Sequence, residues 1–352
     1  MRILQVTPRY PPQSGGVETH VREISEHLTA RGHEVTVITA DAGNGGKCRE
    51  RRNGVTVRRY RSIAPNGMMH FCPKITLAVR KSDADVVHAH NYHSFPLFFS
   101  ALGAGPRPFV VTTHYHGESA SSLRNRLLSL YHPFGRWAVQ RADEVVAVSN
   151  WERERLQSDF GVSATIVPNG VDVERFTNTK PVRRKRPYLL TVGRLEEYKG
   201  VQHVVRAMAK LPEYDLFIAG SGPYREELDR IARDTGVSNQ VEFLGYVDDE
   251  QLPKLYAGAE IYVTMSEFES YGMTVAEALA AGTPCLVRNT TGLSDWIESQ
   301  GVDAVNDVSP ETSAQSIKSA GNSGPPQGSH RSWADVATDL CQTIYSARQL
   351  DY

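Results

Sequence analysis

Short apolar runs alternate with amphipathic stretches along the whole chain. The runs are rich in Val, Ile, Leu and Phe, and several are apolar on both faces, as buried parallel strands are. They read ILQVT, EVTVIT, VTVRRY, DVVHAH, FVVTTH, EVVAVS and ATIVP in the first half, and YLLTVG, DLFIAG, VEFLG, IYVTM and PCLV in the second. Stretches such as 19–31 and 223–235 have helical spacing between them. This βα alternation, repeated twice, predicts an α/β fold with two doubly wound, Rossmann-like domains.

A polar, basic and proline-bounded segment at 172–187 marks the expected hinge between the domains. We therefore expect an N-terminal domain over 1–175 and a C-terminal domain over 176–332. A further loop, rich in Gly, Pro and Ser, is expected at 321–331. The last stretch, 333–352, predicts one more amphipathic helix.

Composition and charge narrow the class of protein. The 352 residues are enough for two domains, and 40% hydrophobic residues can build their cores. The net charge is −1, so nothing draws the chain as a whole to nucleic acid. Residues 1–180, however, hold 23 Lys and Arg against 16 Asp and Glu, while the remaining residues hold 16 against 24. A basic first half favours an anionic surface or ligand for the N-terminal domain.

Several classes of protein are disfavoured. The four cysteines are scattered and form no CxxC, so neither a zinc finger nor a disulfide scaffold is expected. The apolar run at the N-terminus is too short for a signal peptide, and no run approaches the ~18 apolar residues of a membrane span. We therefore expect a cytoplasmic protein.

Two carboxylates, Glu269 and Glu277, lie eight positions apart in the most informative stretch. From 273 to 287 the chain reads MTVAEALAAGTPCLV, and Glu277 is its only charge. This pattern predicts a buried carboxylate, which is costly unless it is paired or faces a polar ligand. Both a structural ion pair and a ligand contact remain open from this stretch alone.

Further polar residues follow predicted strands, where ligands bind in open α/β sheets. Gly15 and Gly16 open a helix after the first strand, so their amides can hold an anion, although a plain turn explains them equally well. Arg194 and Lys199 follow YLLTV and can face one polyphosphate, the alternative being two surface cations. The Gly-Ser-Gly at 220–222 would let a backbone approach a ligand. No GxGxxG or Walker A motif is present, which disfavours NAD and ATP.

Histidines gather at two predicted strand ends. His88 and His90 close one strand, and His114 and His116 follow the next. The spacing does not suit two ligands on one helix, and no acidic ligand set recurs nearby, so we expect no metal site. A histidine that bonds to substrate or handles a proton fits better.

Taken together, the motifs resemble the retaining glycosyltransferases of family 4, which have the GT-B architecture of two Rossmann-like domains facing each other across a cleft. The resemblance covers nearly the whole chain and matches least after Ser309. Its motifs occur in the expected order: the Gly-Gly loop at 15–18, His114, the PNGVD element at 168–172, Arg194 with Lys199, and the E-x7-E element from Glu269 to Glu277.

The resemblance implies roles for the matched residues. Arg194 and Lys199 would neutralise the donor diphosphate in place of a metal, Glu277 would hold the ribose hydroxyls, and Glu269 would contact the transferred sugar. His114 would hydrogen-bond the donor sugar. The remaining donor contacts implied are Gly15, Gly16, Gly245, Tyr246, Val247, Gly272, Met273 and Thr274. The implied catalytic residues are His114, Arg194, Lys199 and Glu269. The final helix from Trp333 would cross back onto the N-terminal domain.

Two features depart from the family pattern. Ser270 follows Glu269 where the family usually has Gly, and RNTTGL at 288–293 occupies the region of a Gly-Gly turn. Both departures bear on the identity of the donor more than on activity.

The segment 123–141 bears on the acceptor, because Arg124, Arg126, Arg136 and Arg141 lie among apolar and aromatic residues there. Such a segment can lie on an anionic membrane, or it can be a core-facing helix with solvated arginines. The basic first half favours a lipid-linked acceptor and a peripheral position on the inner face of the cell membrane.

The sequence thus predicts a metal-independent retaining transferase without a cofactor. It would move a hexose from a nucleotide sugar such as UDP- or GDP-hexose to a glycan or a polyprenyl- or other lipid-linked acceptor, with no role for nucleic acid. A nucleotide-sugar 2-epimerase and a non-catalytic binding subunit are the alternatives. The E-x7-E and GRxxxxKG elements argue against the first, and the presence of Arg194, Lys199 and Glu269 argues against the second.

Overall fold

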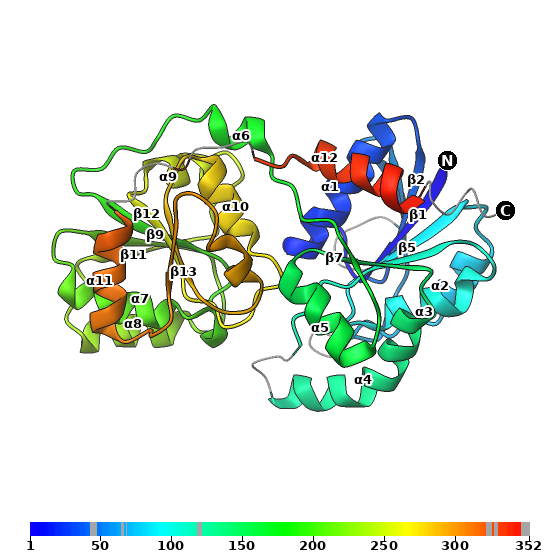
Figure 1. Cartoon of the computed structure of the whole chain (residues 1–352), viewed down its shortest axis with the longest axis horizontal. Helices are drawn as coiled ribbons and strands as arrows, with labels where there is room; N and C mark the ends of the chain where they lie inside the picture. The colour runs from blue at the N-terminus through cyan, green and yellow to red at the C-terminus, as the bar shows by residue number, and fades with distance from the viewer. Residues whose placement is uncertain are drawn as a thin grey trace. The chain divides into compact units, whose positions relative to one another are not determined.

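The computed structural model describes residues 1–42, 48–64, 67, 69–117, 122–321, 326 and 330–345, apart from the side chains of 122–124. The chain divides into two compact units, labelled by element in Figure 1. Unit 1 comprises Met1–Asn169 and the segment from Trp333 onward, and unit 2 comprises Gly170–Ser332. The division falls a few residues before the hinge position expected from the sequence.

Within the described residues, unit 1 is built on an eight-stranded sheet of order β3-β4-β2-β1-β5-β6-β7-β8. Neighbouring strands there are parallel except β3 and β4, which are antiparallel. The strands are β1 (Arg2–Thr7), β2 (Glu34–Thr39), β3 (Arg49–Arg52), β4 (Val55–Arg59), β5 (Val86–His90), β6 (Phe109–Thr112), β7 (Glu144–Ala147) and β8 (Thr165–Ile166). The helices are α1 (Gly16–Ala30), α2 (Lys74–Arg80), α3 (Phe95–Ala104), α4 (Ser122–Gln140), α5 (Asn150–Phe160) and α12 (Trp333–Asp339), followed by a π-helical turn, η5 (Leu340–Tyr345).

Unit 2 has a six-stranded parallel sheet in its described residues, of order β11-β10-β9-β12-β13-β14. The strands are β9 (Tyr188–Val192), β10 (Asp215–Ala219), β11 (Val241–Gly245), β12 (Ile261–Thr264), β13 (Cys285–Arg288) and β14 (Val302–Val305). The helices are α6 (Val173–Thr177), α7 (Val201–Ala207), α8 (Arg225–Asp234), α9 (Leu252–Gly258), α10 (Met273–Ala280) and α11 (Pro310–Ala320), with 3₁₀ turns η2 (Glu197–Lys199), η3 (Met208–Lys210) and η4 (Thr291–Trp296).

Successive strand residues of unit 2 enter different cores. Leu189 packs in a cluster with helices α7, α8 and α11, whereas its neighbour Leu190 packs in a second cluster with helices α9 and α10. Alternate side chains of a strand point to opposite faces, so both faces of this sheet are covered. The double coverage explains why the strand runs are apolar without alternation.

The strand order reverses at one place in each sheet. In unit 1, β1 lies between β2 and β5, and in unit 2, β9 lies between β10 and β12. The loops that leave neighbouring strands in opposite directions at such a point open a crevice at the carboxyl end of the sheet. The residues after β1 and β5, and after β9 and β12, are therefore in the expected place for a ligand.

The fold class predicted from the sequence, two doubly wound α/β sheets, is confirmed. Every run predicted as a strand contains one, but β3 and β14 were missed, the first because RERR carries no apolar pattern. The expected C-terminal helix is interrupted by η5, and residues 346–352 lie outside the described part. Most of the expected loop at 321–331 lies outside it as well. No helix among the described residues has the length and apolarity that crossing a membrane requires.

Candidate active site

Lys199 and Glu269 form an ion pair in unit 2. Lys199 closes the short turn η2 after β9, and Glu269 lies in the loop after β12. Lys199 Nζ donates to Glu269 Oε1 across 2.5 Å, and both side chains are about one-fifth exposed, at 21% and 22%. The two charged motifs singled out in the sequence are therefore in direct contact.

The charge on Lys199 is stabilised by its partner. Burial works against the ammonium, but the charge of Glu269 and the hydrogen bond to it outweigh that effect, so the pKa of Lys199 is raised. The amine is thus a permanent cation at neutral pH. A neutral Lys acting as a proton acceptor is excluded by this arrangement.

Arg194 belongs to the same loop, and its guanidinium has no bidentate partner among the described residues. Its side chain is 51% exposed, and the Glu196 carboxylate approaches Nη1 only to 3.6 Å. Gly193 and Leu195, on either side of it, are fixed by backbone hydrogen bonds to Ala219 and Ser221. A rigid backbone therefore presents an exposed fork of donors beside Lys199.

Gly220 and Gly222 let the chain after β10 pack closely against the loop of Arg194. A Cβ on Gly220 would lie 1.8 Å from the Gly193 carbonyl oxygen, and one on Gly222 would lie 2.3 Å from that of Leu195. This contact within the protein accounts for both glycines. The approach of a ligand to this backbone stays a prediction.

The loop that carries Glu269 is braced by the segment in which the chain departs from the family pattern. Glu269 N donates to Thr291 Oγ1 at 3.0 Å, and Gly292 N donates to the Glu269 carbonyl at 2.8 Å. Trp296 Nε1 donates to the Tyr271 carbonyl at 2.6 Å. The turn η4 thus fixes the backbone of Glu269.

Helix α10 begins directly after this loop. Gly272 precedes the helix in a left-handed conformation with φ of 93°, which favours glycine, and Met273 and Thr274 form the first turn. The Thr274 hydroxyl accepts a hydrogen bond of 2.6 Å from Tyr262. The backbone amides at this helix start carry partial positive charge, and they directly follow the loop that carries Glu269.

Glu277 projects from the second turn of α10. Its Oε2 accepts a hydrogen bond of 2.9 Å from the Tyr256 hydroxyl, and no cation lies within ion-pair distance of it among the described residues. Desolvation raises the pKa of Glu277 to about 7, with the Tyr256 bond opposing the shift. Glu277 is partly buried, which is less than its apolar sequence neighbours predict. Since no cation neutralises it, the ion-pair interpretation is disfavoured.

The three residues expected near the base lie at the end of β11. Gly245 ends the strand, and its carbonyl accepts from Gly220 N at 2.7 Å. Tyr246 is 75% exposed, whereas Val247 packs against the apolar core. Of the three, only Tyr246 offers a large free surface.

The glycine pair in unit 1 opens helix α1. A Cβ on Gly15 would lie 2.3 Å from Glu18 Oε2, so this glycine makes room for a buried carboxylate. Glu18 pairs with Arg9 Nε at 2.7 Å. Gly16 faces open space, and a side chain there would meet nothing within 4 Å.

His114 follows β6 in a left-handed conformation with φ of 46°, which is uncommon outside glycine. Its ring lies against those of His20 and His90, with centroid distances of 4.7 and 6.1 Å. His20 comes from α1 and was missed in the sequence, because it stands alone on a helix that otherwise reads as amphipathic. His20 joins His88, His90 and His114 in one buried cluster, whereas His116 is partly buried and stacks on His93.

Glu152 fixes the chain on both sides of His114. Its Oε1 accepts from Thr113 Oγ1 and from Tyr115 N, each at 2.5 Å, and its Oε2 accepts from Val148 N. Burial raises the pKa of Glu152 to about 7, although these three bonds oppose the shift. The capping-box spacing from Ser149 to Glu152 was the available signal in the sequence.

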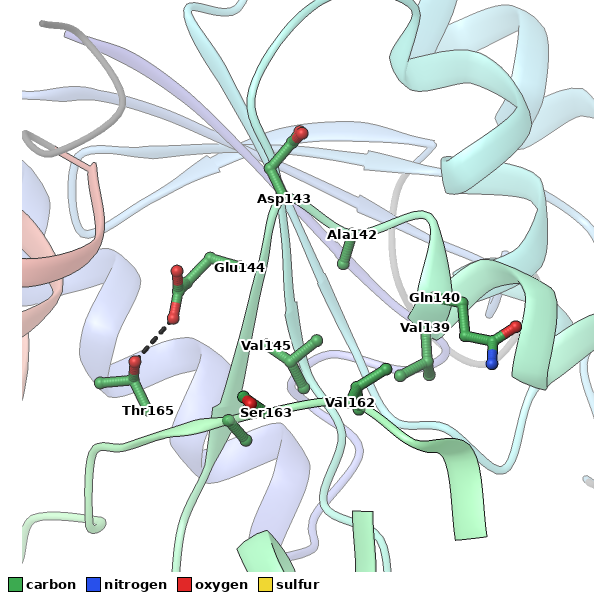
Figure 2. A pocket seen from close by; sticks show the side chains of 10 residues that line it. Val139, Gln140, Ala142, Asp143, Glu144, Val145, Val162, Ser163 and Thr165 are labelled. Atoms are coloured by element: carbon green, nitrogen blue, oxygen red, sulfur yellow. Dashed lines mark hydrogen bonds between the residues drawn. The ribbon is translucent and has the colours of Figure 1, made fainter. Parts of the chain in front are cut away.

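Figure 2 shows a pocket elsewhere in unit 1, at the end of α4 and beside β7. It is lined by residues 139–140, 142–145 and 162–165, and one hydrogen bond of 2.6 Å, from Thr165 to Glu144, crosses it. None of the charged or histidine residues discussed above lines this pocket. Its chemistry gives no reason to place the reaction there.

Comparisons with known proteins agree with the chemistry of both units. Residues 14–175 match Glycosyltransferase Family 4, and residues 172–330 match Glycosyl transferases group 1. An uncharacterized glycosyltransferase of Methanocaldococcus jannaschii is 30% identical over 331 residues, covering 85% of this chain and 83% of that protein. A glycogen synthase of Mycobacterium tuberculosis is 30% identical over 335 residues, covering 84% and 80%. The GDP-mannose-dependent alpha-(1-6)-phosphatidylinositol monomannoside mannosyltransferase of Mycolicibacterium smegmatis is 30% identical over 330 residues, covering 84% and 82%.

Solved structures share the fold. Sucrose-phosphate synthase from Thermosynechococcus elongatus superposes with a TM-score of 0.75 at 19% identity, covering 100% of this chain and 99% of that one. Anabaena HepE in complex with UDP gives a TM-score of 0.73 at 18% identity, with 100% of both chains covered. With both halves matched in order by the family and the fold shared throughout, the chain belongs to glycosyltransferase family 4 and is a retaining glycosyltransferase of the GT-B fold that uses a nucleotide-sugar donor.

Proposed function

We propose that this enzyme transfers a hexose from a UDP- or GDP-hexose to a lipid-linked acceptor at an anionic membrane surface, without a metal ion at the diphosphate. The part of the proposal that concerns the donor rests on two cations, Arg194 and Lys199, which lie on one rigid loop, with Glu269 in contact with Lys199. The acceptor half rests on an exposed aromatic and basic surface of unit 1.

Arg194 and Lys199 would bind the donor diphosphate, which is also the leaving group. Glycosyl transfer proceeds through an oxocarbenium-like state in which negative charge grows on the departing phosphate. Fixed cations stabilise that charge as it develops, which is the role a metal ion plays in other transferases. Lys199 is already charged and ordered by Glu269, so little reorganisation is needed.

Glu269 and Glu277 would bind the two sugar rings of the donor. Glu269, next to the diphosphate cations, would accept hydrogen bonds from the transferred hexose. Glu277 would accept them from the ribose hydroxyls, because it is only partly buried and its carboxylate has, within the described residues, the Tyr256 hydroxyl as its one hydrogen-bond partner. Hydroxyl donors satisfy a carboxylate without a counter-ion. The amides at Gly272, Met273 and Thr274 would add contacts to phosphate at the start of α10.

Unit 1 would contribute His114, Gly15 and Gly16 to the same donor. His114 would donate a hydrogen bond to a sugar hydroxyl, and its position is fixed by the Glu152 bonds to its two neighbours. Gly16 leaves open space at the start of α1, where a sugar or phosphate can approach the backbone. Gly245, Tyr246 and Val247 would lie against the base.

An exposed group of rings supports the membrane part of the proposal. Phe71, Phe134 and Trp137, which we call the aromatic surface, are 42%, 46% and 43% exposed. They are connected through the partly buried rings of Phe95 and Phe98, at centroid distances between 5.2 and 6.3 Å. Exposed rings from two segments, joined in this way through a third segment, mark an interaction site more often than a scatter of single residues does.

The charge around the aromatic surface is of one sign. Helices α2, α3 and α4 contain no Asp or Glu. Their basic residues are Lys74, Arg80, Arg124, Arg126 and Arg136, of which only Arg124 has a side chain outside the described part. Aromatic rings beside cations suit the interface of an anionic bilayer, where rings enter the headgroup region and cations pair with phosphates. A core-facing helix with solvated arginines does not require Phe134 and Trp137 to be exposed.

The names of the relatives support a lipid or a glycan acceptor equally. One is a phosphatidylinositol monomannoside mannosyltransferase and another a glycogen synthase, both at 30% identity. The aromatic surface is what favours the lipid. A polymer acceptor would need polar and aromatic stacking positions, but not a helix surface free of acidic residues.

A thermal-shift screen against UDP, GDP, ADP and their hexose conjugates tests the donor half. Binding at a hundredfold excess over Kd stabilises a protein by about 2.7 kcal/mol, so the true nucleotide should raise Tm visibly. The shift should be lost in Arg194→Ala with Lys199→Ala and kept in Lys210→Ala, where only a surface pair with Glu311 is removed. A wild-type protein that no nucleotide stabilises would contradict the proposal.

A further inference from the structure

Three histidine side chains of unit 1 lie together, and each has one ring nitrogen without a hydrogen-bond partner in the described part of the chain. They are His20 of α1, His90 of β5 and His114 after β6, with exposures of 2%, 0% and 6%. The nitrogens without partners are His20 Nε2, His90 Nδ1 and His114 Nε2. One ligating nitrogen from each of the three rings lies within 4.8 Å of the others.

The outer nitrogens determine which tautomers are present. His20 Nδ1 lies 2.7 Å from the Asn169 side-chain oxygen, and His90 Nε2 lies 2.6 Å from that of Gln5. Amide oxygens only accept, so both outer nitrogens carry the proton. His20 Nε2 and His90 Nδ1, which have no partner among the described residues, therefore hold free lone pairs.

Fixed outer protons and free inner lone pairs are the arrangement that metal-binding histidines have. A ligating imidazole almost always donates its other N–H to an oxygen acceptor, which sets the tautomer and the ring orientation. His88, the neighbouring buried histidine, provides the contrast. Both of its ring nitrogens are hydrogen-bonded, one to the Tyr345 hydroxyl and one to the Thr112 hydroxyl, so neither is available to bind a metal ion.

Leaving the three nitrogens bare is costly. Each buried polar atom without a partner costs about 1–3 kcal/mol, and here three converge. An occupant that accepts lone pairs removes the whole cost.

We propose that His20, His90 and His114 bind a divalent transition-metal ion, most readily Zn²⁺, as a structural clasp within unit 1. Three imidazoles suit Zn²⁺, Cu²⁺ or Ni²⁺, whereas Mg²⁺ and Ca²⁺ take oxygen ligands. Tetrahedral Zn–N bonds of about 2.0–2.1 Å require nitrogens about 3.4 Å apart, so each nitrogen moves toward the centre of the three by about 0.8 Å or less. The sequence argument against a metal considered only strand-end residues, and the helix residue His20 completes the set.

The metal ion would fix the orientation of the His114 ring, which is proposed to contact the donor sugar. A metal on His114 Nε2 forces the remaining proton onto Nδ1, and the ring makes no hydrogen bond among the described residues. Nδ1–H is then available to donate to a sugar hydroxyl. The ion would tie α1, β5 and the segment after β6 together at the strand-order reversal of the sheet. This site lies wholly in unit 1 and takes no part in the chemistry at Arg194 and Lys199.

Metal content of untagged protein, purified without chelator, is the first measurement. Elemental analysis should give close to one equivalent of zinc per chain. Apoprotein prepared with dipicolinate should then take up one Co²⁺ with the visible absorption of four-coordinate cobalt, and Zn²⁺ should displace it. Zinc-free protein whose apo form takes up no Co²⁺ would overturn the proposal and leave a buried water as the occupant, since water can also bridge three nitrogens.

Variants separate the site from adventitious binding. His20→Gln and His90→Gln should lose the bound equivalent, whereas His203→Gln, a partly buried histidine of unit 2, should keep it. If the first two variants do not fold, Asn169→Asp retains all three ligands and supplies a stronger acceptor to His20. It should tighten zinc affinity by about tenfold. Unchanged zinc affinity in Asn169→Asp together with zinc retained in His90→Gln would exclude this ligand set.

Discussion

Lys199 Nζ lies 2.5 Å from Glu269 Oε1, which joins two motifs separated by 70 positions in the chain. In this pair the carboxylate holds the cation in place, and the cation offsets the cost of the half-buried carboxylate. A diphosphate that binds Lys199 must share it with Glu269. Donor binding and the position of the sugar-contacting carboxylate are thereby linked.

Lys199→Ala should slow transfer in the reaction step more than in donor binding. The missing contact acts on charge that develops as the diphosphate leaves, so kcat should fall by roughly 30- to 1,000-fold, on the order of 2–4 kcal/mol. Steady-state kinetics at saturating donor measures this. Because Glu269 would lose its partner, Lys199→Ala with Glu269→Gln is the matched variant, and it should be as slow. Unchanged turnover in Lys199→Ala would remove the diphosphate role.

Glu277 should make stability and donor binding respond to pH in opposite directions. Its folded-state pKa of about 7 lies above the ordinary value of 4.5, so the folded state holds the proton more tightly. Its contribution to stability is present below about pH 4.5 and is lost as the pH rises through about 7. Glu277→Gln should therefore unfold at higher urea than wild type at about pH 8 and at similar urea near pH 4.5.

Donor affinity provides the other half of that test. The ionised carboxylate is the stronger acceptor for ribose hydroxyls, so wild-type affinity should rise between about pH 6 and pH 8. In Glu277→Gln the affinity should be low and should not change with pH. Equal affinities of the two proteins at pH 8 would separate Glu277 from the nucleotide.

Transfer should not need a free divalent cation. Arg194 and Lys199 supply the positive charge at the diphosphate, so a brief exposure to EDTA should leave the rate within about twofold of the rate with Mg²⁺. The assay is initial velocity with EDTA, with Mg²⁺ and with Mn²⁺. A buried three-histidine ion would exchange slowly and would not be removed in that time. Loss of activity that Mg²⁺ or Mn²⁺ restores would refute a metal-free diphosphate site.

Gly200→Ala should destabilise unit 2 strongly, because two costs coincide there. Gly200 has φ of 69°, and a Cβ would lie 2.0 Å from the Met265 carbonyl oxygen. We expect a loss of about 3 kcal/mol or more. Gly236→Ala is the control, since its φ of 73° is similar and nothing lies within 4 Å. That variant should lose only about 1 kcal/mol, and denaturant unfolding compares the two.

Phe134→Ser with Trp137→Ser should weaken binding to vesicles that contain anionic phospholipid. Both rings are exposed in the protein, so folding should change little. The same rings would be buried in the bilayer on binding, so their loss should reduce membrane affinity by tenfold or more. Sedimentation with vesicles measures it, and Tyr246→Ser, an exposed ring of unit 2, serves as control. Full binding by the double variant would leave the aromatic surface without this role.

The parts of the fold set by local pattern could be predicted from the sequence. Runs such as YLLTV are buried on both faces of a parallel sheet, so they lack alternation and stand out as strands. The order of strands brings Arg194 and Glu269 to one edge, and their placement after strands was sufficient to expect both there. Which cation pairs with which carboxylate depends on side-chain packing, so the Lys199–Glu269 pair was not foreseen.

Residues whose role depends on a distant backbone were missed or misjudged. Glu152 binds the chain around His114, and the spacing from Ser149 to Glu152 indicates a helix start but not that contact. The close approach of Gly220 to the Gly193 carbonyl was not foreseen, because it is a tertiary feature. Glu277 was predicted to be buried because its sequence neighbours are apolar, but it is only partly buried, since a carboxylate on an eight-residue helix can face a different side from them.

Tyr345 links a late part of the chain to the first strands of unit 1. Its buried hydroxyl bonds to His88 and to Gln5, so residues that follow unit 2 in the sequence complete a sheet whose strands precede unit 2. Unit 2, by contrast, is one continuous stretch. On the ribosome, all residues of unit 2 are therefore present before unit 1 has α12 and η5. Unit 2 can thus begin to fold while unit 1 still lacks residues that pack on its sheet.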